Sequence, residues 1–143
     1  MTDFTLFISS PEKKTRKTEL QCYGIDLGTT NSTVAETIWR QGEKPACRIL
    51  EINQVTQHGL YTSPLVPSVV AILPDDQVWV GEGAKRLRTR PQEAGLVFEK
   101  NLFYETKNDM GLRRTYYRAP EPFNHASKIA GHILRTSGMP IKI

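Results

Sequence analysis

An aspartate and a polar turn containing glycine lie between two apolar runs near the start of the chain. In the stretch GIDLGTTNS, Asp26 is followed by Gly28, Thr29, Thr30 and Asn31. A glycine lets backbone N–H groups approach a ligand closely, and the hydroxyl and amide side chains add donors that suit a polyphosphate. A carboxylate repels phosphate unless a cation lies between them, and Mg²⁺ binds one or two carboxylates together with water and phosphate oxygens. These residue types therefore indicate one half of a Mg²⁺–nucleotide site.

A purely structural interpretation of this stretch stays open. In a β-hairpin, glycine, threonine and asparagine often do no more than satisfy the backbone of the turn. The stretch is not a P-loop, because no G-K-[ST] follows, and no G-x-G-x-x-G opens a helix as in a Rossmann fold.

The elements on either side of the turn predict an antiparallel meander. Apolar runs at 20–27, 32–39 and 46–52 read as three strands, and QGEKP at 41–45 provides the second turn. The polar stretch 53–64, which contains a glycine and a proline, is predicted to be a loop.

A second hairpin and two helices are predicted further along. Strands at 67–73 and 78–80 flank the turn PDDQ, and a short helix at 81–90 ends before a proline. Residues 105–122 read as irregular, and a second helix is predicted at 121–136. We therefore predict an α/β fold that combines an antiparallel β-meander, a hairpin and helices.

The composition is that of a globular protein that does not cross a membrane. The chain has 143 residues, of which 38% are hydrophobic and 24% charged, and this is enough to bury a core. No segment approaches the roughly 20 apolar residues that span a bilayer. No basic segment precedes the short apolar run at 6–8, so we expect no secretion signal and a cytoplasmic location.

The cysteines and the basic residues carry no predicted function. Cys22 and Cys47 fall on the first and third predicted strands, about 9.5 Å apart and beyond the roughly 7 Å limit for a disulfide. The net charge is +4, but no aromatic interleaving or reader motif accompanies the basic runs, so we expect no nucleic-acid partner. Those runs are Lys13, Lys14, Arg16 and Lys17 in an early extension, and Arg86, Arg88 and Arg90 later.

GIDLGTTNS resembles the first phosphate motif of the DnaK-like, seventy-kilodalton heat-shock chaperones, whose ATPase domain has the actin fold. Further matches follow in the family's order over about residues 22–143: VPSVVA at 66–71, VGEGAK at 80–85, FEKNL at 98–102 and SKIA at 127–130. The resemblance implies a division into a basic extension at 1–19 and the N-terminal portion of an actin-like, ribonuclease H-like lobe I at 20–143.

The resemblance also implies roles for single residues. Asp26 would hold Mg²⁺ through water, while Gly28, Thr29, Thr30 and Asn31 would line the phosphates of ATP or ADP, and the Thr29 hydroxyl would help to position the terminal phosphoryl group.

The resemblance assigns the catalytic lysine to Lys100. The family continues after its lysine with R-L-I-G, whereas here NLFY follows.

For a complete parent, the resemblance implies ATP hydrolysis coupled to protein folding in the stress response. The partners would be unfolded polypeptides, a J-domain co-chaperone and a nucleotide exchange factor. The second phosphate motif, D-L-G-G-G-T, is absent from the sequence, so we expect a truncated lobe that is inactive alone. Two alternatives stay open: a carbohydrate-kinase-like member of the same superfamily, and a non-enzymatic truncated interaction module.

Overall fold

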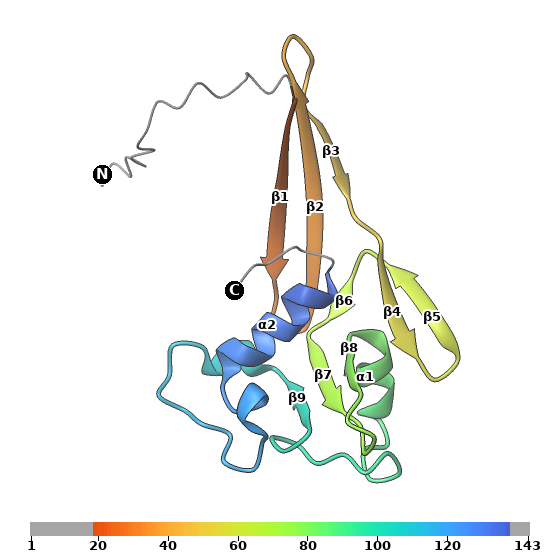
Figure 1. The fold of residues 1–143 in the computed structure, drawn as a ribbon, viewed down its shortest axis with the longest axis vertical. Coiled ribbons are helices and arrows are strands. Elements are labelled where there is room, and N and C mark those ends of the chain that lie inside the picture. Colours follow the sequence, from red (N-terminus) through yellow and green to blue (C-terminus); the bar gives the residue numbers. More distant parts are fainter. Residues whose placement is uncertain (1–18, 138–143) are drawn as a thin grey trace.

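The computed structural model describes residues 19–137, which form a mixed α/β fold of mostly antiparallel strands with few helices (Figure 1). The fold class predicted from the sequence is confirmed at this level. The strands are β1 (Glu19–Leu27), β2 (Asn31–Arg40), β3 (Ala46–Ile49), β4 (Ile52–Thr56), β5 (Gly59–Ser63), β6 (Val66–Pro67), β7 (Val69–Ile72), β8 (Val78–Val80) and β9 (Leu102–Tyr104). The helices are α1 (Glu82–Leu87), α2 (Ala126–Thr136) and the 3₁₀ turns η1 (Thr106–Asp109) and η2 (Glu121–Phe123).

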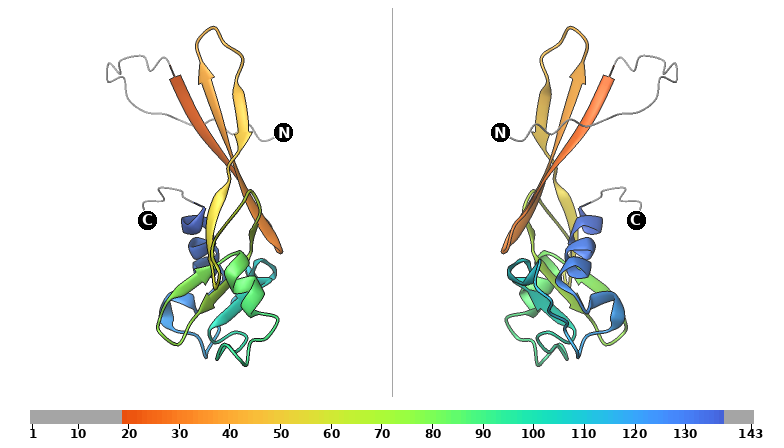
Figure 2. Two further views of the ribbon diagram at one scale, coloured as in Figure 1. Left: turned by 90° about the vertical axis from the view of Figure 1, so that its right-hand side faces the viewer. Right: turned by 90° about the vertical axis from the view of Figure 1, so that its left-hand side faces the viewer.

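Strands β1, β2 and β3 form the predicted antiparallel meander, which we call the arm because it projects from the rest of the fold (Figures 1 and 2). Cys22 and Cys47 both pair with Thr37 on the central strand, so a full strand separates them. Both cysteines are free, as predicted, and both are exposed. At the base of the arm, β6 pairs with the first residues of β2.

A small sheet in the order β8-β7-β9 forms the centre of the rest of the fold, which we call the body. All four residues of β7 are buried, because one helix covers each face of this sheet. Val70 packs in one cluster with Ile129 and Ile133 of α2. On the opposite face, Ala71 packs in a second cluster with Ala84 and Leu87 of α1.

The prediction of a loop at 53–64 is wrong. This stretch pairs as the hairpin β4–β5 with a turn at Gly59, where φ is +105°. The strand pattern is hidden because two of the three inward-facing residues of β4 are polar: Gln54 and Thr56 are buried beside Ile52. The strand predicted at 46–52 ends at Ile49, and its last residue, Ile52, belongs to β4.

Further elements differ from those predicted, and the helix predicted at 81–90 spans only Glu82–Leu87. The predicted strand at 67–73 is divided at Ser68 into β6 and β7, which belong to different sheets. The sequence pattern does not predict strand β9, because the strand is short and its partner β7 lies far away in the sequence. The second helix begins at Ala126 rather than 121, because Pro122 lies in a separate 3₁₀ turn.

Some sequence-based expectations lie outside the described residues. The basic extension was predicted at 1–19, and all of it lies outside the described residues except Glu19, which begins β1. The helix stop at Gly138 and the apolar end of the chain fall on 138–143. Within residues 19–137, no helix combines the length and apolar character needed to cross a membrane.

Candidate functional site

The turn between β1 and β2 is tight, and its shape requires glycine at position 28. Leu27 pairs with Ser32, so the four residues between them form the whole turn. A Cβ atom on Gly28 would lie 2.0 Å from the carbonyl oxygen of Asn31, which is far inside contact distance. Any other residue would therefore force the turn to open.

Ser68 anchors the turn to the strand that follows β6. Its hydroxyl donates a hydrogen bond of 2.8 Å to the carbonyl of Gly28, and its backbone N–H donates one of 2.8 Å to the carbonyl of Thr30. The Ser32 hydroxyl lies 3.0 Å from the Ser68 hydroxyl, and both side chains are buried. Ser68 thus binds two carbonyls of the turn, and these hydrogen bonds fix the conformation of the turn's backbone.

Sequence reasoning assigned Ser68 to a strand and missed this role. The available signal was the polar residue itself, since a serine in the otherwise apolar stretch VPSVVA needs a partner when it is buried.

The predicted ligand-binding side chains of the turn are accessible. Asp26 is exposed at the end of β1, and Thr30 and Asn31 are exposed beyond it, while Thr29 is half-buried. Asp26 pairs with Thr33, so its side chain lies on the opposite face of the sheet from the neighbouring pair of Leu27 and buried Ser32. The structure therefore keeps Asp26, Gly28, Thr29, Thr30 and Asn31 together in one continuous feature.

Asp26 is the carboxylate that this feature offers to a metal ion. Within residues 19–137, no group of three or more His, Cys, Asp or Glu side chains could hold a metal ion. Asp26 offers one exposed carboxylate, and one carboxylate is sufficient for Mg²⁺ when phosphate oxygens and water complete its octahedral shell. The residues present thus suit Mg²⁺ that arrives with a nucleotide.

The structure does not bring Lys100 to the turn. Lys100 is exposed in the segment before β9, where it lines a depression with Asp76 and Arg118. The neighbouring Asn101 carbonyl accepts a hydrogen bond from Ile72, at the far end of β7 from Ser68. The length of β7 therefore separates Lys100 from the turn, a distance of about 13 Å at about 3.3 Å per residue.

A different lysine, Lys107, lies beside the turn. It lines a small cavity of about 10 Å³ together with Gly28, Ser68 and Met110. Tyr104 pairs with Val69, so the chain that leaves β9 reaches the level of Ser68 as η1 begins, and η1 carries Lys107. In the sequence, Lys107 is followed by NDMG, which places Gly111 four residues after the lysine.

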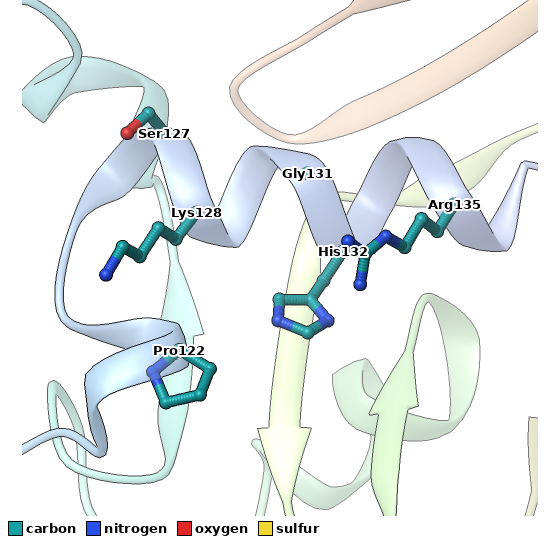
Figure 3. Close-up of a pocket in the computed structure, with 6 residues that line it drawn as sticks. All are labelled: Pro122, Ser127, Lys128, Gly131, His132 and Arg135. Atoms are coloured by element: carbon teal, nitrogen blue, oxygen red, sulfur yellow. The ribbon is translucent and has the colours of Figure 1, made fainter. Parts of the chain in front are cut away.

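A second depression lies along the outer side of α2, away from the turn (Figure 3). The ring of His132 stacks on the ring of Phe123, with 4.3 Å between the ring centres. Lys128 donates a 3.0 Å hydrogen bond to the backbone carbonyl of Glu121 and forms an ion pair with the carboxylate of the same residue. Burial lowers the pKa of His132 below its ordinary value, despite a hydrogen bond from the ring to Pro122. These contacts join η2 to α2, so this depression has a structural role.

A scan against models of known protein families finds no match to this chain.

Proposed function

We propose that this chain supplies the first phosphate-binding half of a Mg²⁺–ATP site in an actin-like ATPase of the DnaK-like chaperone class. One observation carries the proposal: a glycine turn whose carbonyls are bound by Ser68 follows directly after the exposed Asp26 and shares a small cavity with Lys107. A carboxylate that can bind Mg²⁺, a glycine turn and a nearby lysine are residue types that suit a magnesium-bound polyphosphate.

Each residue of the turn has a stated part in this proposal. The backbone at Gly28 and the side chains of Thr29, Thr30 and Asn31 would bind phosphate oxygens, and Asp26 would hold Mg²⁺ through water. The bound Mg²⁺ would neutralise phosphate charge. Catalysis of phosphoryl transfer depends mainly on such positioning and charge neutralisation.

Lys107 takes the catalytic role that the resemblance alone assigned to Lys100. An ammonium group next to the turn can balance charge on the terminal phosphate and orient a water molecule, whereas one at the other end of β7 is too far away. Gly111 follows Lys107 by four residues, which is the spacing of lysine and glycine in the K-R-L-I-G pattern of the DnaK-like family, and this supports the same choice.

The wider activity is part of the proposal and rests on the sequence resemblance. A complete parent would hydrolyse ATP in the cytoplasm, bind unfolded polypeptides, and work with a J-domain co-chaperone and a nucleotide exchange factor. Because the sequence lacks D-L-G-G-G-T, the chain alone should bind ATP weakly and should not turn it over.

Nuclear magnetic resonance can test this weak binding residue by residue. We expect millimolar Mg²⁺–ADP to shift the amide signals of residues 26–31 and 107, and Asp26→Asn to remove the dependence on Mg²⁺. Lys107→Ala should weaken binding about tenfold, while Lys100→Ala serves as the matched control and leaves it unchanged. If no signal near the turn moves, the proposal fails, and if only Lys100→Ala has an effect, the assignment of the lysine fails.

A further inference from the structure

The segment that carries Lys107 is short and strained, so other residues must hold it in place. Lys107 lies in η1, a 3₁₀ turn of four residues that cannot be stable by itself. Glu105, directly before it, has a φ of +57°, in the left-handed region that residues other than glycine rarely adopt. Such a conformation persists only where the surrounding structure fixes it.

Asp109, at the end of η1, is the point at which the segment is fixed. Its carboxylate accepts hydrogen bonds of 2.8 and 2.9 Å from one guanidinium nitrogen of Arg114, and one of 2.9 Å from the hydroxyl of Tyr116. Burial alone would raise the pKa of Asp109, but these hydrogen bonds outweigh it and leave the pKa below its ordinary value. Asp109 therefore remains a carboxylate, and its hydrogen bonds to Arg114 are charge-assisted.

Both partners of Asp109 are themselves held. Tyr116 is only 3% exposed, packs on Phe103 at 5.7 Å and donates its backbone N–H to Asn124. Arg114 also donates to Glu99 at 2.5 Å, and its guanidinium lies 5.6 Å from the centre of the Tyr116 ring. The network thus connects η1 to the core beneath β9 and to the start of α2.

We propose that Asp109, held by Arg114 and Tyr116, is a positioning residue that keeps Lys107 beside the turn at Gly28. Lys107 precedes Asp109 by two residues, so fixing the carboxylate fixes the turn of chain from which the lysine projects. Met110, which follows Asp109, lines the same cavity as Gly28 and Lys107, so the segment lines this cavity on both sides of Asn108. The functional consequence for Lys107 rests on the proposed nucleotide site.

Amide hydrogen exchange tests the positioning without any ligand. Tyr116→Phe keeps the buried ring and removes the hydroxyl, and Tyr117→Phe is its matched control because Tyr117 is 93% exposed. We expect Tyr116→Phe to speed exchange at residues 106–111 by about tenfold, to leave β1 and β2 unchanged, and Tyr117→Phe to change nothing. Unchanged exchange at 106–111, or an equal increase throughout the chain, would overturn the proposal.

A double-mutant cycle separates positioning from a general structural effect. In titrations with Mg²⁺–ADP, Tyr116→Phe should weaken binding several-fold in the wild-type chain and should have no further effect in Lys107→Ala. A loss that persists in the Lys107→Ala background would show that Tyr116 does not act through Lys107. If the wild-type chain binds no nucleotide, the proposed function fails, while the exchange measurement still decides whether Asp109 fixes the segment.

Discussion

Gly28 and Ser68 shape the β1–β2 turn in different ways. Gly28 leaves room for the carbonyl of Asn31, and Ser68 binds two other carbonyls of the same turn. The first requirement is steric and the second is hydrogen bonding, so substitutions at the two positions should have separable effects.

Replacing Gly28 by alanine should destabilise the fold by about 1–3 kcal/mol, because the added methyl group meets backbone that cannot move freely. Gly24, in the strand β1 that leads into the turn, is the matched control, since an added Cβ there meets nothing within 4 Å. Urea unfolding of both variants gives the comparison. We expect Gly24→Ala to be neutral or slightly stabilising, and equal losses from the two variants would contradict the steric argument.

The roles of Asp26 and the turn residues stay a prediction from the sequence, whereas the proposal for Lys107 needed the structure. The turn is a local feature bounded by two apolar strands, and such features are readable from residue types. Which lysine lies beside the turn depends on how residues 97–104 pair with β7. Leu102, Phe103 and Tyr104 form an apolar run without alternation, so the sequence does not define the register of that pairing.

At the level of elements, the β4–β5 hairpin shows how a buried polar residue conceals a strand. The Gln54 side chain is fully buried, and its carbonyl oxygen accepts a 2.8 Å hydrogen bond from the backbone of Glu82 at the start of α1. Its amide nitrogen donates to the carbonyl of Leu65 at 3.1 Å. Gln54 therefore caps a helix that has no side-chain cap of its own.

Gln54→Ala should cost about 2–4 kcal/mol, because it leaves a cavity and removes the hydrogen-bond partners of two backbone groups. Asn53→Ala is the control on the outward face of the same strand, where the side chain is exposed and bonds only to Thr62. Thermal unfolding followed by circular dichroism would compare the variants. A similar loss from both would mean that the burial of Gln54 is not what stabilises the hairpin.

The arm, the β7–β8 hairpin and both helices were predictable because each has a clear local pattern. The two elements that were missed, the β4–β5 hairpin and β9, owe their conformation to contacts with distant parts of the chain. In β4, a buried amide replaces the expected apolar residue, and in β9 the three residues are paired along their length with β7. Tertiary contacts of this kind override local preference.

At the level of the whole molecule, groups in both the arm and the body couple stability to pH in the same direction. A hydrogen bond from Arg48, at 2.6 Å, and one from Gln21 lower the pKa of Glu36 in the arm below its ordinary value of 4.5. Burial lowers the pKa of His132 in the body below 6.5. In each case the unfolded chain takes up the proton first, so acid favours unfolding.

Stability should therefore fall in two stages as the pH is lowered. The first stage begins near pH 6.5 as unfolded His132 becomes protonated, and the second begins below about pH 4.5, where the contribution of Glu36 is lost. Urea unfolding between pH 8 and pH 3 measures both stages. His132→Gln should reduce the first stage and leave the second intact, and an unchanged first stage would contradict the assignment to His132.

The pairing of Cys22 and Cys47 with the same residue of β2 gives the arm a natural pair of spectroscopic labelling sites. These are the chain's two cysteines, both are exposed, and two strand spacings separate their backbones by about 10 Å. Nitroxide labels on the two thiols should therefore show strong dipolar broadening in an electron paramagnetic resonance spectrum, without any engineered residue. Loss of that broadening in denaturant would report separation of the arm's strands, independently of probes in the body. A folded chain without broadening would contradict the register.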